Sequence, residues 1–123
     1  MNLKLQSIAN KGEPDKERLA IKVINDTDIG DYLLLRTGTT ENSPTTAVFN
    51  TLWFPHNEVK AGDLIVVYSK AGANRTKELE SGKTAYFYYW GSPDALWSED
   101  KEGVKSAVLL NAPEWDSATA EEI

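Results

Sequence analysis

Three aspartates in one turn are the first side chains whose type and spacing could support chemistry. Asp26, Asp28 and Asp31 place carboxylates at near-alternate positions, a partial likeness to a calcium-binding loop. The downstream glutamate that completes such a loop is missing, and Asp-rich turns between strands commonly bond their own backbone. We therefore expect a structural turn and no metal site, although the residues alone leave ion binding open.

The single histidine is the second candidate. His56 follows Phe54-Pro55 and lies near Glu58 and Asp63, so a carboxylate-assisted base can be imagined. Such a base needs a nucleophile or a metal, and no nucleophile-elbow pattern surrounds any serine. The chain has no cysteine, which removes thiolate nucleophiles and Cys-ligated zinc. We expect no enzyme, no catalytic residue and no cofactor.

The charge balance bears on the class of partner. The 123 residues include 13 Lys plus Arg and 19 Asp plus Glu, a net charge of -6. This sign disfavours an interface built on phosphate contacts. The one small basic cluster, residues 74–77, is followed by Glu78 and Glu80, which weaken its field. A nucleic-acid accessory protein is therefore only the weaker alternative.

Apolar residues recur with a period of two between turns rich in Gly, Pro, Asn and Asp, which predicts strands. We expect an all-β, immunoglobulin-like antiparallel β-sandwich of about seven to nine strands. A proline after Ser92 predicts one short helical turn within residues 94–104. The acidic residues 116–123 are expected to be a frayed tail or a last edge strand. The strands are predicted over residues 3–8, 19–24, 32–37, 46–54 with an interruption, 64–68, 84–90 and 107–111.

Three of these strands, residues 32–35, 64–68 and 86–90, are apolar or aromatic at consecutive positions, so both of their faces need cover. In the last one, Tyr86, Tyr88 and Trp90 point one way and Phe87 and Tyr89 point the other. The cover can be the connection 91–105, with Leu96 and Trp97 folded over the outer face. A protein partner, a second copy, or a sugar that stacks on aromatic rings are the alternatives.

The order of motifs from Phe54 onward resembles the lamin tail domain. Phe54-Pro55 comes first, followed by Val59-Lys-Ala-Gly62, the strand at residues 65–68 and Ala71-Gly-Ala73. An aromatic strand ending in Trp90-Gly91 and the strand Ala107-Val-Leu-Leu-Asn111 follow in the same order as in that family. Each motif is short, but together they are colinear over about residues 18–120.

This resemblance implies a non-catalytic immunoglobulin-like domain that contacts proteins and, in some members, DNA or chromatin. No heptads precede the domain and the net charge is acidic, so the chain is more similar to stand-alone bacterial or phage relatives than to a nuclear lamin. Residues 1–17 are expected to form an arm or edge strand, and residues 18–123 the sandwich. Without a signal-peptide pattern or a long apolar run, a soluble, cytoplasmic protein is expected.

The predicted function is a non-enzymatic interaction module that binds a protein partner or itself through an aromatic sheet face. A carbohydrate-binding or glycan-acting domain that uses the same rings is the alternative. The predicted binding residues are Tyr86, Tyr88, Tyr89, Trp90, Trp97 and Trp53.

Overall fold

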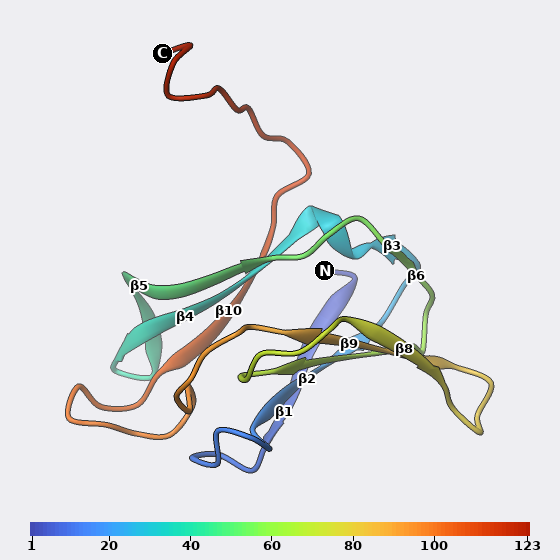
Figure 1. The fold of residues 1–123 in the computed structure, drawn as a ribbon, viewed down its shortest axis with the longest axis horizontal. Helices are drawn as coiled ribbons and strands as arrows, with labels where there is room; N and C mark the ends of the chain where they lie inside the picture. The colour runs from blue at the N-terminus through green and yellow to red at the C-terminus, as the bar shows by residue number, and fades with distance from the viewer.

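The computed structural model describes all residues, 1–123, and its strands form two layers (Figure 1). In chain order the elements are β1 Leu3–Ala9, β2 Arg18–Val23, β3 Thr27–Asp28, the 3-10 helix η1 Ile29–Asp31, β4 Tyr32–Thr40, β5 Ser43–Trp53, β6 Glu58–Val59, β7 Leu64–Tyr68, β8 Arg75–Glu78, β9 Thr84–Tyr89 and β10 Ser106–Asn111. The expectation of an all-β sandwich is confirmed.

One layer is a five-stranded sheet in the order β1-β2-β7-β9-β8, and the other is a three-stranded sheet in the order β10-β4-β5. Strands β3 and β6 pair at one end of the sandwich (Figure 1). All neighbours are antiparallel except β7 and β9, which run parallel. After β7 the chain first forms β8 at the edge of the sheet. It then returns as β9, which lies between β8 and β7, antiparallel to β8 and parallel to β7.

The core lies between the two sheets and follows the alternation of the strands. From the five-stranded sheet it takes Leu19, Ile21 and Ile65, and from the three-stranded sheet Tyr32 and Leu34, all at most 2 % exposed. One end of the core is filled by the β5–β6 connection, and the other by the connection after β9. The two layers are therefore joined by irregular segments as well as by strands.

All seven predicted strands exist, with small differences at their ends. Strands β3, β6 and β8 were not predicted, because two are only two residues long and β8 is exposed and polar throughout. The predicted helical turn in residues 94–104 is wrong. Ser92 Oγ accepts a hydrogen bond from the Asp94 backbone (3.1 Å), but no helix follows it.

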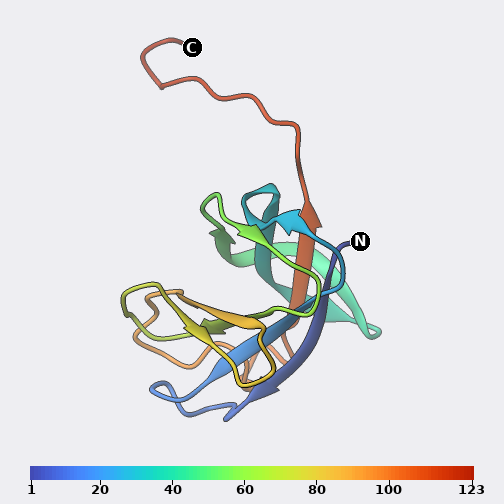
Figure 2. The ribbon, with the colours of Figure 1, turned by 90° about the vertical axis from the view of Figure 1, so that its right-hand side faces the viewer.

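The two ends of the chain differ. Strand β1 pairs along its length with β2 of the same chain and forms an edge of the large sheet. Residues 112–123 form no strand, and the end of this segment extends away from both layers (Figure 2).

Candidate functional site

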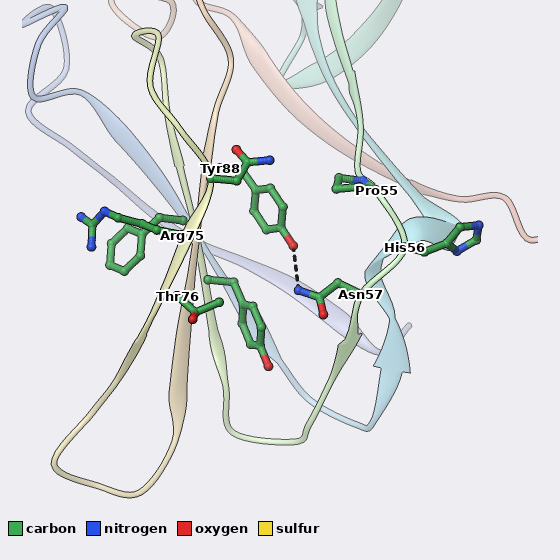
Figure 3. A pocket seen from close by; sticks show the side chains of 9 residues that line it. Pro55, His56, Asn57, Arg75, Thr76 and Tyr88 are labelled. Carbon is green, nitrogen blue, oxygen red and sulfur yellow. Dashed lines mark hydrogen bonds between the residues drawn. The ribbon is translucent and has the colours of Figure 1, made fainter.

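Strand β9 divides its aromatic side chains between the two faces of the large sheet. Tyr88 is 4 % exposed and contacts Phe54 edge to face, with ring centroids 5.2 Å apart. Tyr86 packs against the same core. Phe87 and Tyr89 lie on the outer face, as the alternation predicted. Figure 3 shows the same division, because Tyr88 and Arg75 of the neighbouring strand project to opposite sides of the sheet.

The six predicted binding residues therefore do not share one face. Tyr88 and Trp97 belong to the core, and Tyr86 and Trp90 pack against it. Trp90 and Trp97 contact each other with centroids 5.9 Å apart. The expectation of a common exposed face needs this correction, because alternate residues of a strand point to opposite sides. Only Tyr89 and Trp53 lie outward, and they belong to different sheets.

The connection at residues 91–105 closes the core instead of covering the outer face, which corrects a second expectation. Leu96 and Trp97 are 4 % and 6 % exposed and lie among the core residues. Their backbone N–H groups donate to the carboxylate of Glu17, at 2.6 and 3.2 Å. Ser69 Oγ donates to the same carboxylate at 2.5 Å, and the backbone of Gly12 at 3.0 Å.

Glu17 is fully buried, and burial alone would raise its pKa. The hydrogen bonds from Ser69, Gly12, Leu96 and Trp97 favour the charged form and outweigh burial, so the pKa of Glu17 lies below its ordinary value. No sequence pattern indicates this role, because three of the four donors are backbone groups and two of them are about eighty residues away.

Arg36 and Lys105 hold the same connection from the side of the small sheet. Arg36 Nε donates to the Leu96 carbonyl at 2.5 Å. The ammonium of Lys105, whose side chain is 1 % exposed, lies 2.6 Å from an Asp100 carboxylate oxygen and 2.8 Å from the Gly103 carbonyl. The hydrogen bond from Lys105 lowers the pKa of Asp100. Polar contacts thus fix a segment that has no regular secondary structure.

The outer face of the large sheet is covered by its own aromatic rings and by cations. Tyr68 and Tyr89 stack with centroids 5.3 Å apart and planes at 10°. Arg75 lies over the ring of Phe87 at 4.0 Å, and Lys70 lies 5.3 Å from the centroid of Tyr68. These contacts shield the second face of β7 and β9 within a single chain.

The outer face of the small sheet carries a group of exposed and half-buried apolar side chains. Leu33 pairs directly with Leu110 on one side and with Trp53 on the other, so the three side chains share this face. Leu35 and Val108 lie in the next row, beside Thr51. Trp115, from the segment after β10, contacts Trp53 edge to face with centroids 5.1 Å apart. We call this surface the apolar face; it comprises Leu33, Leu35, Trp53, Val108, Leu110 and Trp115.

A pocket of about 190 Å³ lies between β8, β9 and the connection at residues 55–57. In it Asn57 Nδ2 donates to the Tyr88 hydroxyl at 3.3 Å (Figure 3). Burial raises the pKa of Tyr88, and the hydrogen bond from Asn57 opposes this shift. His56 is directed away from Tyr88 (Figure 3), so the pocket does not bring its histidine and its tyrosine together as an acid–base pair.

The aspartate turn is tied to the chain by hydrogen bonds. Asp28 Oδ1 accepts from the backbone of Gly30 and Asn57 at 2.8 and 3.0 Å, and Oδ2 lies 3.0 Å from His56 Nδ1. Partial burial alone would raise the pKa of Asp28, but these contacts outweigh burial and lower that pKa. Asp26 Oδ1 accepts from the backbone of Ala61 at 2.8 Å. Asp28 thereby joins the start of η1 to the residue before β6. The structure contains no group of three or more His, Cys, Asp or Glu side chains that could hold a metal ion.

Comparison of the chain with models of known protein families and with curated protein sequences finds no match. The structure contains no helix long and apolar enough to cross a lipid bilayer.

Proposed function

We propose that this protein is a non-enzymatic interaction module that associates with a second copy of itself through the apolar face. The observation that carries the proposal is the register of the small sheet, which brings Leu33, Leu110 and Trp53 into one row on the outer side. Contiguous exposed apolar surface marks interaction sites in soluble proteins. A lamin-tail-like contact domain is consistent with this role and is part of the same proposal.

Exposure supports the choice of this face. Trp53, Leu110 and Trp115 are 47 %, 42 % and 59 % exposed, although each has a large apolar side chain. Trp residues are enriched at interfaces because they combine a large contact area with a polar group. Here the indole N–H of Trp53 already donates to the Gly30 carbonyl at 2.9 Å, so a partner can cover its ring without leaving that group unpaired.

Charge favours a second copy as the partner. The outward positions of the small sheet that form the apolar face carry no charged side chain. Two copies related by a two-fold axis can bring these sheet positions together without opposing like charges, since a two-fold interface sets each surface against itself. Elsewhere the net charge of -6 makes copies repel. The apolar face is therefore the surface on which self-association costs least.

No specific observation favours the carbohydrate alternative. A sugar platform needs an open ring face, whereas Tyr68 and Tyr89 stack on each other and Arg75 lies over Phe87. We therefore do not put that alternative forward.

Sedimentation velocity of matched variants tests the proposal. Leu110→Ser and Trp115→Ser each remove apolar surface from the apolar face, and Val104→Ser removes a similar exposed side chain, 57 % exposed, from the connection at residues 91–105. We expect the two face variants to weaken self-association at least about tenfold, roughly the loss of one well-buried side chain, and Val104→Ser to leave it unchanged. Equal effects of all three variants, or none, would contradict the proposal.

A further inference from the structure

The outer face of the large sheet gathers basic side chains, although the chain as a whole is acidic. The register places Lys4 directly opposite Lys22 on this face, and Arg18 beside Tyr68. Near the other edge of the sheet and on the same face, Arg75 pairs with Phe87 and Lys77 with Ala85. We call this surface the basic face. With Lys70, which lies over Tyr68, it holds six of the thirteen basic residues: Lys4, Arg18, Lys22, Lys70, Arg75 and Lys77.

Acidic side chains are missing from the same positions. The only acidic residue in the five strands is Glu78, and its pairing with Thr84 puts it on the opposite side from Lys77. All ion pairs of the chain involve other cations, namely Arg36, His56, Lys60 and Lys105. The six cations of the basic face therefore have no carboxylate partner within the chain.

The arrangement has a cost within the chain. Lys4 and Lys22 face each other directly on neighbouring strands, and like charges in that position destabilise a sheet. Both side chains are exposed, so water lessens the repulsion without removing it. An anion bound between them would convert the repulsion into an attraction.

Aromatic rings occupy the middle of the basic face. Tyr68, Phe87 and Tyr89 lie on β7 and β9, and the cations of β1 and β2 flank them on one side and those of β8 on the other. Strands β2 and β8 are three strand spacings apart, about 14 Å. This width leaves room for one extended chain of nucleotides with its phosphates over either row of cations.

Arg75 supplies a planar group at the surface. Its guanidinium carbon lies 4.0 Å from the centroid of Phe87, and its Nε donates to the Tyr89 hydroxyl at 3.3 Å. A guanidinium stacked on a ring presents its second plane outward, and nucleic-acid bases stack on such planes. The cation thus offers charge to a phosphate and a flat surface to a base.

From this layout we infer that the basic face binds single-stranded nucleic acid without sequence preference. Such binding needs a positive surface that follows the backbone together with planar groups on which bases stack, and the basic face provides both. An acidic protein segment would use the cations alone and would leave the outward plane of the Arg75 guanidinium unused. The net charge of -6, which disfavoured nucleic acid at the level of composition, is a sum over the whole chain. It does not describe the basic face, where the strand pairing gathers cations without carboxylates. This inference concerns a different sheet from the apolar face and does not depend on the proposed self-association.

The test is fluorescence anisotropy with a labelled oligothymidylate of about 20 nucleotides, a length that exceeds the site sizes of small single-strand binders. Full-length protein is titrated at several salt concentrations, beginning near 50 mM. Arg75→Gln and Lys22→Gln each remove one cation from the basic face. Lys101→Gln removes one exposed cation from the turn at residues 100–103 and is the matched control for net charge.

We expect binding at low salt that weakens as salt rises, with a log–log slope of about -2 to -4, since each phosphate contact on a single strand contributes about -0.7. Arg75→Gln and Lys22→Gln should each weaken binding at least about threefold and make the slope shallower by about 0.7. Lys101→Gln should do neither. Arg75→Lys keeps the charge but loses the plane, so it should weaken binding while preserving the slope.

Three outcomes would overturn the inference. One is the absence of binding near 50 mM salt at protein concentrations of about 100 μM, since non-specific sites reach that range at physiological salt. Another is an equal loss in Lys101→Gln and in the two face variants. The third is competition by polyglutamate as effective as competition by unlabelled oligothymidylate, which would assign the face to an acidic protein segment. Circular dichroism and thermal unfolding of each variant separate these outcomes from misfolding.

Discussion

Glu17 Oε1 lies 2.6 Å from the backbone nitrogen of Leu96, which is 79 positions further along the chain. Through this contact the residue that precedes β2 holds the connection that follows β9. Leu96 and Trp97 enter the core because their N–H groups find a buried acceptor there. This carboxylate thus holds the connection against the core, together with the contacts of Arg36 and Lys105.

Replacing Glu17 by glutamine should destabilise the fold by about 2–4 kcal/mol, because a neutral amide accepts weaker hydrogen bonds and its NH2 group would face two of the four donors. Chemical denaturation monitored by tryptophan emission measures the change. Ser69→Ala removes only one donor and should cost about 1 kcal/mol. The control is Glu58→Gln, at an exposed glutamate, and a loss for Glu17→Gln no larger than for this control would contradict the assigned role.

Acid should destabilise the protein partly through Glu17. Its pKa is lower in the folded state than in the unfolded state, so its stabilising contribution is complete above the unfolded value, about 4.3. The contribution is lost as the pH falls through the lower folded value. The free energy of unfolding should therefore decline below about pH 4.3, and Glu17→Gln should show a shallower decline. Parallel pH profiles for the two proteins would show that Glu17 does not titrate as described.

The strands were predictable from sequence because each needs only local alternation. Tyr86, Tyr88 and Trp90 were correctly separated from Phe87 and Tyr89 by the period of two. The sequence could not show which of the two sets faces the core, since both sets are aromatic. That choice depends on the position of the small sheet and on Leu96 and Trp97, which are positioned by Glu17.

The two candidate faces were less predictable than the strands. The basic face brings Lys4, Lys22 and Arg75 together from three strands that are distant in sequence, and only the pairing register aligns them. The run of apolar residues in β4 indicated that its second face needs cover. Leu110 and Trp115 belong to the apolar face because of strand pairing and the position of the segment after β10, which no local sequence pattern shows.

The hydroxyl of Tyr32 is buried without a hydrogen-bond partner in the structure. An unpaired buried hydroxyl costs about 1–3 kcal/mol of desolvation, so Tyr32→Phe should leave stability unchanged or raise it by about 1 kcal/mol. Tyr88→Phe, the matched control, removes a hydroxyl that accepts a bond from Asn57 and should cost about 1 kcal/mol. Thermal unfolding of both variants measures this. A loss above about 1 kcal/mol for Tyr32→Phe would mean that its hydroxyl has a partner, such as a bound water.

Two tryptophans should behave in opposite ways. Trp97 is 6 % exposed and lies in the core, so Trp97→Ala should cost about 3–5 kcal/mol. Trp115 is 59 % exposed and contacts the ring of Trp53, so Trp115→Ser should cost less than about 1 kcal/mol in dilute solution. Urea denaturation at low protein concentration measures both. Similar costs for the two variants would contradict the placement of one in the core and the other on the apolar face.

The mass of the wild-type protein in solution tests the proposed self-association most directly. Light scattering on a size-exclusion column, over about a hundredfold range of concentration, follows the association by mass action. We predict that the mass rises with concentration from the 13.7 kDa of one chain to twice that value. A mass of 13.7 kDa at every concentration would contradict the proposal that the apolar face binds a second copy.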